Sequence, residues 1–158
     1  MVDKLDLRIL EILSKDGREN KTSISNKLGK SPNTIKKRAE DLKEIGVIKN
    51  YGVQIDFEKL GYEIIAIIEM TIDKGKMIEV ERNIAQDPHI FAVYDITGEY
   101  DALVIARFKT RSEMNKMIKK IHTFQYVQRT NTHLVLSIIK EEDSFTDLIQ
   151  IDEEKESK

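Results

Sequence analysis

Residues 21–46 read KTSISNKLGKSPNTIKKRAEDLKEIG, and this stretch decides the fold of the first third of the chain. Apolar residues recur in it at helical spacing on either side of Gly29, namely at Ile24, Leu28, Ile35, Ala39, Leu42 and Ile45. Ser31 can cap the second helix, which puts Pro32 at a first position where its missing N–H costs nothing. We therefore predict one helix that starts at Thr22 and closes at Gly29, and another that runs from Ser31 to Gly46.

The residues before this stretch predict a third helix. Asp3 is a suitable N-cap, Gly17 a suitable end, and the apolar series between them has helical spacing at Leu5, Ile9, Ile12 and Leu13. Three short helices with tight junctions are typical of a helix-turn-helix. We assign residues 1–47 to such a domain.

The charge distribution indicates what this domain binds. The net charge of the chain is −2, yet residues 1–50 carry 12 Lys and Arg against 8 Asp and Glu. Residues 21–38 contain six basic residues and no acidic one, and such a surface gains affinity for double-stranded DNA by releasing counterions. In a helix-turn-helix the start of the third helix enters the major groove, where an Asn can bond adenine and a Lys guanine. The predicted DNA contacts are Thr22, Ser23, Lys30, Ser31, Asn33, Thr34, Lys36, Lys37 and Arg38.

The rest of the chain predicts an α+β fold with a second domain. Residues 48–61 resemble a linker strand, and residues 62–140 alternate between strand and helix patterns. The order is strand, helix, strand, strand, helix, strand, which is the ferredoxin-like split pattern. The predicted strands are 62–73, 90–97, 102–108 and 126–139, and the predicted helices are 76–86 and 111–122.

One face of the predicted sheet has no cover within the chain. The two helices cover the other face, although the strands are apolar on both faces. An uncovered apolar face marks an interface, so we predict a homodimer through it. The segment 141–158 carries 8 acidic and 2 basic residues and is predicted to be an acidic, solvated tail.

Other classes of protein fit the composition poorly. There is no cysteine, so a disulfide scaffold, a zinc finger and thiol catalysis are excluded. The three histidines lack metal-ligand spacing, and the seven glycines form no phosphate-binding loop. We expect no enzyme, metal or cofactor, no membrane span and a cytoplasmic location. Frequent Lys, Glu and Ile favour an archaeal or thermophilic source.

Residues along the whole chain resemble the leucine-responsive regulator/AsnC (Lrp/AsnC) family of transcription regulators. The resemblance covers residues 3–140. Each of its motifs is weak alone, but together they are specific for the family. In the first half these motifs are Leu5-Asp6, Ile9-Leu10, Gly17-Arg18, Gly29, Ser31, Thr34, Arg38, Leu42, Gly46-Val47-Ile48 and Leu60-Gly61. In the second half they are Thr97-Gly98-Glu99-Tyr100-Asp101, Thr130-Asn131-Thr132, Val135-Leu136 and Ile139-Lys140.

The resemblance implies a winged-type helix-turn-helix joined to a ferredoxin-like regulatory domain, in dimers that often assemble into octamers. It also implies that an amino acid binds near the turn that ends in Asp101 and near the last strand. Asp101 would accept from the ammonium group, and the N–H groups near Gly98 would hold the carboxylate. Thr130 and Thr132 share one face of a strand. The implied effector residues are Gly98, Glu99, Tyr100, Asp101, Thr130 and Thr132.

Three alternatives stay open at this point. The turn at 98–101 can be an ordinary hairpin turn whose Asp simply bonds its own backbone. The scaffold can also be that of an enzyme, because sirohaem decarboxylases are similar to this family in both domains. Finally, the chain can be a modulator of a paralogue that no longer binds DNA.

Overall fold

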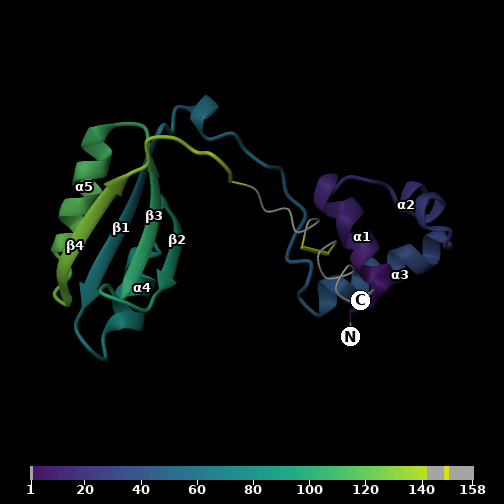
Figure 1. Cartoon of the computed structure of the whole chain (residues 1–158), viewed down its shortest axis with the longest axis horizontal. Helices are drawn as coiled ribbons and strands as arrows, with labels where there is room; N and C mark the ends of the chain where they lie inside the picture. The colour runs from purple at the N-terminus through teal and green to yellow at the C-terminus, as the bar shows by residue number, and fades with distance from the viewer. Residues whose placement is uncertain (1, 142–147, 150–158) are drawn as a thin grey trace. The chain divides into compact units, whose positions relative to one another are not determined.

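The computed structural model of the chain describes residues 2–141, 148 and 149 (Figure 1). The described residues divide into two compact units. Residues 2–54, with 140, 141, 148 and 149, form the first unit, and residues 55–139 form the second. No helix in the described part is long and apolar enough to cross a membrane.

The first unit contains the three predicted helices, α1 (Lys4–Lys15), α2 (Lys21–Leu28) and α3 (Pro32–Glu44). The predicted caps of α1 and α3 are confirmed, since the side chains of Asp3 and Ser31 each accept a backbone N–H three residues later. Pro32 is the first residue of α3. The apolar stripes meet in one core formed by Ile9, Leu13, Ile24, Ile35, Leu42 and Ile48.

Two details of this unit differ from the prediction. Asn20, not Thr22, caps α2, because its Oδ1 accepts the Ser23 N–H at 2.7 Å and starts the helix earlier. Ile45 belongs to the apolar series of the predicted helix and was expected in its buried stripe, but 60% of it is exposed because it follows the last turn of α3. The turn between α2 and α3 follows the prediction, with Gly29 at a φ of 62°.

The predicted linker strand over 48–61 is wrong. The structure places no strand among these residues, and the one regular element is a short 3₁₀ helix, η1 (Glu58–Leu60). A strand is stabilised by a hydrogen-bonded neighbour, and the described part of the chain offers none to this segment. The alternating apolar residues of this segment therefore mark extended backbone that is not part of a sheet.

The second unit has the predicted order of strands and helices. Its strands are β1 (Ile64–Ile72), β2 (Ile90–Asp95), β3 (Ala102–Phe108) and β4 (Val127–Leu134), and its helices are α4 (Met77–Ile84) and α5 (Arg111–His122). The sheet has the order β2-β3-β1-β4, and each neighbouring pair is antiparallel. This is the ferredoxin-like arrangement.

Alternation along the two central strands separates the two faces of this sheet. On one face Ile68, Met70, Val104 and Phe108 are fully buried in a core with the apolar residues of both helices. The opposite face carries half-buried residues such as Ile67, and no helix of the second unit packs on it. The predicted open face is therefore present in the single chain.

The last strand is shorter than predicted. It ends at Leu134 instead of residue 139, because its partner β1 begins at Ile64 and offers few further groups. The final backbone contact of this ladder is the Val135 N–H to the Ile65 carbonyl, at 3.0 Å. Most of the predicted acidic tail, at 142–147 and 150–158, lies outside the described residues.

Candidate DNA-binding and effector sites

The start of α3 combines a fixed backbone with exposed polar side chains. The Ser31 hydroxyl accepts the Thr34 N–H at 3.1 Å and lies 2.8 Å from the Thr34 hydroxyl, so both hydroxyls are used within the cap. Asn33 and Lys37 are exposed, and neither side chain has a polar partner in the described part of the chain. These two side chains are therefore available to a ligand on this surface.

A carboxylate organises the neighbouring helix α2. Glu19 accepts hydrogen bonds from the Ser23 hydroxyl and from the Lys27 ammonium, the latter at 2.9 Å. The bond from Ser23, and then the one from Lys27, hold the pKa of Glu19 below its ordinary value. Ser23 was predicted to contact DNA, but its hydroxyl is used here by Glu19. Glu19 was not among the predicted site residues, because it precedes the acid-free stretch.

Arg38 is also engaged within the unit. Its Nη1 donates to Asp3 Oδ2 at 2.7 Å and lies 3.3 Å from Oδ2 of Asp6, which is buried. The Asp6 N–H and then Arg38 lower the pKa of Asp3, and Asp3 in turn raises the pKa of Arg38. Arg38 thus ties α3 to the start of α1. The spacing of Asp3 and Asp6, which form a capping box, was the available signal.

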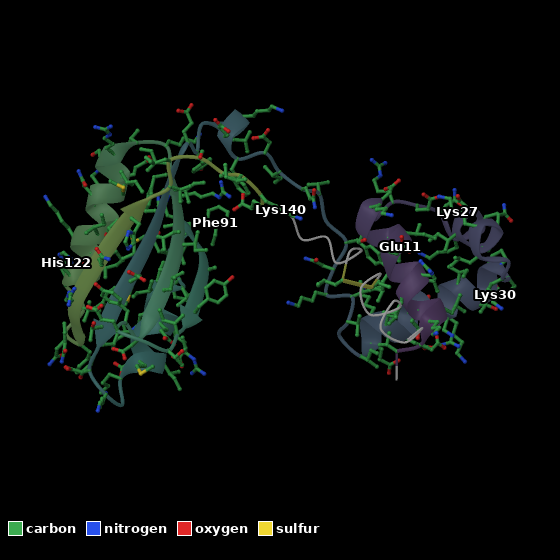
Figure 2. All side chains as sticks on the ribbon, viewed as in Figure 1. Glu11, Lys27, Lys30, Phe91, His122 and Lys140 are labelled. Carbon is green, nitrogen blue, oxygen red and sulfur yellow. The ribbon has the colours of Figure 1, made fainter. Side chains whose placement is uncertain are left out.

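The remaining predicted contacts lie on the surface. Thr22 and Lys30 are exposed, and Figure 2 shows Lys30 at the turn between α2 and α3. Lys36 is exposed and its ammonium lies 3.9 Å from Glu40, a weak surface pair. Among the predicted contacts, Lys30, Asn33, Lys36 and Lys37 therefore keep basic or amide side chains exposed on the surface of the unit.

The turn between β2 and β3 contains four of the predicted effector residues. Gly98 adopts a φ of 129°, which favours glycine. Asp101 is tied to β1, because its Oδ2 accepts the Ile72 N–H at 2.8 Å and its N–H donates to the Met70 carbonyl at 3.0 Å. The carboxylate of Asp101 therefore fixes this end of the sheet by bonding the backbone of β1, whereas an ordinary hairpin turn would have it bond the backbone of its own turn.

Arg129 on β4 reaches the same turn and was not among the predicted site residues. Its guanidinium donates to the Tyr100 hydroxyl at 2.9 Å, lies over the Tyr100 ring at 5.3 Å and approaches Glu99 at 3.3 Å. It pairs across the sheet with Thr71, on the open face. A lone Arg in a strand gave no signal that it would meet a turn 29 residues earlier.

The two predicted threonines lie on the other face of β4. Thr130 and Thr132 oppose Met70 and Ile68 in register, so both belong to the side that the helices cover. The Thr130 hydroxyl lies 2.6 Å from Nε2 of His122, which is labelled at the end of α5 in Figure 2. The threonines thus share a face, but in the single chain they are separated from Tyr100.

Two family models match the chain. The Winged helix-turn-helix DNA-binding family matches residues 2–49, and the Lrp/AsnC ligand binding domain matches residues 65–145. The second match alone spans more than half of the chain.

The chain belongs to the Lrp/AsnC family of transcription regulators. Curated relatives are similar in sequence over nearly the full length of this chain. An HTH-type transcriptional regulator of Pyrococcus furiosus is 43% identical, over 89% of this chain and 95% of its own. The HTH-type transcriptional regulator FL11 of the same organism is 37% identical, over 89% of this chain and 93% of its own. The chain is therefore a DNA-binding regulator with a ligand-binding domain.

Solved structures share the fold of this Lrp/AsnC-family chain. Escherichia coli AsnC has a TM-score of 0.86 at 24% identity and covers 91% of this chain and 98% of its own. Bacillus subtilis LrpC has a TM-score of 0.79 at 29% identity, over 90% and 99% of the two chains. A Neisseria meningitidis regulator solved as an L-Met complex has a TM-score of 0.84 at 24% identity, over 94% and 99%.

Proposed function

We propose that this regulator reads double-stranded DNA with the start of α3, and that a free amino acid bound to its second unit alters that reading. The observation that carries the first part is the exposed, unpaired group of Asn33 and Lys37 beside a fixed helix start. Asn33 suits an adenine edge, and Lys30, Lys36 and Lys37 suit guanine or phosphate. Thr22 and Ser31 border the same surface, whereas Ser23, Thr34 and Arg38 contribute indirectly.

The proposed effector is an amino acid at the 98–101 turn. The Neisseria meningitidis protein with the same fold was solved with L-Met, which motivates the ligand class. In this chain the turn offers Glu99 and Tyr100 beside Arg129, a cation suited to a carboxylate. Because Thr130 and Thr132 lie apart from these groups in one chain, the complete effector site would need a second copy.

The proposed assembly is a homodimer through the open sheet face, with octamers built from dimers. Half-buried Ile67 and Ile105 lie on this face, and Tyr94, opposite Leu103 in register, is 54% exposed. Apolar side chains that no helix of the unit covers support a second chain as their cover. Ile105→Glu should therefore yield monomers in sedimentation, whereas Lys119→Glu on α5 should not.

DNA binding is tested with the fragment upstream of the protein's own gene. The full chain should retard this fragment in a gel, and Asn33→Ala together with Lys37→Ala should weaken the retardation. Lys43→Ala, at the other end of α3, is the matched control. Retardation that is the same for all three proteins would refute α3 as the reader, and no retardation would favour the modulator of a paralogue. We propose further that the protein acts in the cytoplasm and has no catalytic role.

The effector proposal is tested by calorimetric titration with the twenty amino acids. Binding of at least one is expected, and Arg129→Gln should weaken it about tenfold through loss of a charge-assisted bond. Heat from none of the twenty would refute the sensor. If the Arg129→Gln protein binds the amino acid with unchanged affinity, the effector site does not lie at the 98–101 turn.

A further inference from the structure

Three polar side chains meet on the open sheet face, between β1 and the edge strand β4. Glu69 lies on β1, and Asn131 and His133 lie on β4, which pairs directly with β1. The Glu69 Oε2 atom lies 3.1 Å from Nδ2 of Asn131 and 3.0 Å from Nε2 of His133, and these two nitrogen atoms are 2.9 Å apart. The three atoms therefore form a nearly equilateral triangle.

Hydrogen bonds alone do not satisfy this triangle. Nε2 of an imidazole has either one proton or one lone pair, so it bonds one neighbour at a time. A protonated Nε2 donates to Glu69 but then faces an N–H of Asn131, whereas an unprotonated Nε2 accepts from Asn131 but faces the Glu69 carboxylate. Turning the Asn131 amide over places its carbonyl oxygen against the same carboxylate. One edge of the triangle is thus repulsive in each arrangement, and a cation in contact with all three side chains removes the repulsion.

The edge lengths of the triangle match those of a metal coordination shell. Imidazole nitrogens and carboxylate oxygens bind Zn²⁺ at roughly 2.0–2.2 Å. Neighbouring ligands ~2.1 Å from an octahedral ion lie ~3.0 Å apart, which is the spacing of the three atoms here. Asn131 can supply its amide oxygen, because a turn of the amide exchanges its nitrogen and oxygen. The three donors then occupy one face of the octahedron.

The surroundings of the triangle suit an ion that arrives from solvent. The side chain of His133 is 55% exposed and that of Glu69 is 24% exposed, so both can be reached. Ile67 opposes His133 in register, and an apolar neighbour strengthens the attraction between a cation and a carboxylate. Arg129, further along β4, is directed to Glu99 at 3.3 Å, and this pairing offsets its repulsion of a metal ion.

We propose that Glu69, Asn131 and His133 bind a divalent metal ion of the zinc class. One imidazole with two oxygen donors favours Zn²⁺, Co²⁺ or Ni²⁺ over Mg²⁺, which prefers oxygen ligands alone. The described part of the chain holds no cysteine and no group of three or more His, Asp or Glu that could hold a metal, so the Asn131 amide completes the ligand set. All three ligands come from one chain, so the site does not depend on the proposed homodimer.

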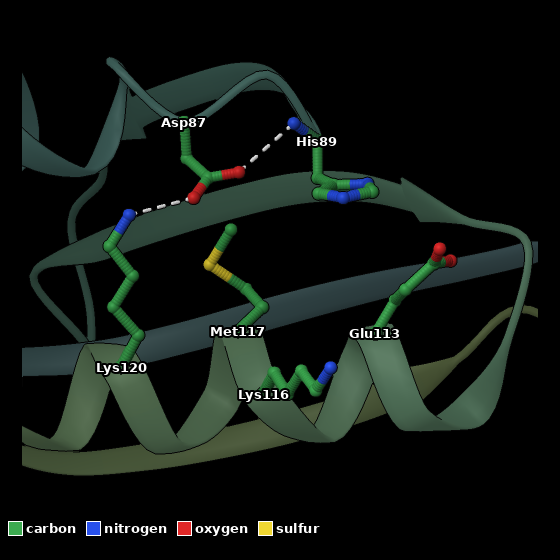
Figure 3. Close-up of a pocket in the computed structure, with 6 residues that line it drawn as sticks. All are labelled: Asp87, His89, Glu113, Lys116, Met117 and Lys120. Atoms are coloured by element: carbon green, nitrogen blue, oxygen red, sulfur yellow. Dashed lines mark hydrogen bonds and ion pairs between the residues drawn. The ribbon is translucent and has the colours of Figure 1, made fainter.

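His89 also lies beside carboxylates, but the groups around it are already bonded. Figure 3 shows His89 and Glu113 on the rim of a hollow, with Asp87 bonded to Lys120 and to the backbone N–H of His89. Nδ1 of His89 lies 2.9 Å from the Arg107 carbonyl. These contacts hold the imidazole and the Asp87 carboxylate within the fold, and Lys120 adds a positive charge. A metal ion should therefore select His133 over His89.

The test is a titration of the full-length protein with zinc sulfate, followed by the imidazole proton resonances of its three histidines. The resonances of His133 should shift and saturate, whereas those of His89 and His122 should not. Magnesium sulfate at the same concentration should leave all three unchanged. Glu69→Gln should weaken zinc binding by at least about tenfold, because the loss of a ligand costs no less than the loss of a group that supports one.

His122→Gln is the matched control for His133→Gln, because each variant removes one exposed imidazole. Zinc affinity should be unchanged in His122→Gln and fall by at least about tenfold in His133→Gln. Circular dichroism without zinc checks that all the variants fold. Equal shifts at the three histidines, equal affinity of the two His variants, or unchanged affinity of Glu69→Gln would overturn the site. An equal response to magnesium would overturn the zinc class of the ion.

Discussion

The assignment of Arg38 as a positioning residue gives a prediction that separates it from its neighbour Lys37. Arg38 donates through Nη1 to Asp3 at 2.7 Å and lies against the buried Asp6, whereas exposed Lys37 has no polar partner in the described part of the chain. Replacing each by Gln removes one positive charge from α3 in both cases. The two variants should nevertheless affect DNA binding differently.

The expected magnitudes follow from counterion release. Each phosphate contact contributes about 0.9 to the slope of log affinity against log salt, so its loss changes the affinity ratio between 50 and 200 mM salt about 3.5-fold. Lys37→Gln should make the fall of log affinity with log salt shallower by about 0.9. It should change the free energy of unfolding by less than about 0.5 kcal/mol. Arg38→Gln should leave the slope unchanged, so that the affinity for DNA falls by the same factor at every salt concentration. It should also lower the melting temperature of the protein.

Fluorescence anisotropy with a labelled duplex measures the slope, and any duplex serves because phosphate contacts are independent of sequence. Thermal unfolding of the same samples gives the stability. A slope that falls by about 0.9 in Arg38→Gln, with an unchanged melting temperature, would show that Arg38 contacts phosphate. The ion pairs with Asp3 and Asp6 would then be unimportant for positioning α3.

Three further predictions concern stability. Asn20→Ala should lower the free energy of unfolding by about 1 kcal/mol, and Thr22→Ala by less than about 0.5 kcal/mol, because Asn20 caps α2; equal effects in urea titrations would restore Thr22 as the cap. Phe108→Ala should cost about 3–5 kcal/mol, because the ring is fully buried in the core; a loss below 1 kcal/mol would contradict that packing. Glu81→Gln should stabilise the protein at pH 7 but not at pH 4. Burial, and then the charge of Asp95, raise the pKa of Glu81, and one of its buried oxygens has no partner among the described residues. The ionised form therefore destabilises the fold above the unfolded pKa of about 4.3, and equal stability of both proteins at pH 7 would contradict this.

Much of the fold could be predicted because periodicity and caps carry it. Asp3, Ser31 and Pro32 marked two helix starts correctly, and the 102–108 strand and the 111–122 helix have the predicted bounds. Prediction failed where pairing decides the structure. Alternating residues in 48–61 and apolar residues at 135–139 are typical of strands, but the described part of the chain supplies no partner strand for either segment.

The sites were less predictable, because charge counts do not show which groups neutralise each other. Arg38 and Ser23 were predicted to contact DNA, whereas in the folded chain Asp3 and Glu19 accept their hydrogen bonds. Arg129 lies far along the chain from the turn it contacts, so no local motif connected the two. The family resemblance pointed to the 98–101 turn as a site but did not show that Asp101 bonds the backbone of β1.

The central claim, that the start of α3 lies in a DNA groove, is tested most directly by site-specific crosslinking. The chain has no cysteine, so Asn33→Cys and Lys43→Cys each give a single attachment point for a photoactivated crosslinker. Both positions are exposed and lie at opposite ends of the same helix. Asn33→Cys should crosslink to a bound duplex, and Lys43→Cys should crosslink much less. Equal crosslinking from the two ends, or stronger crosslinking from Lys43→Cys, would contradict the account.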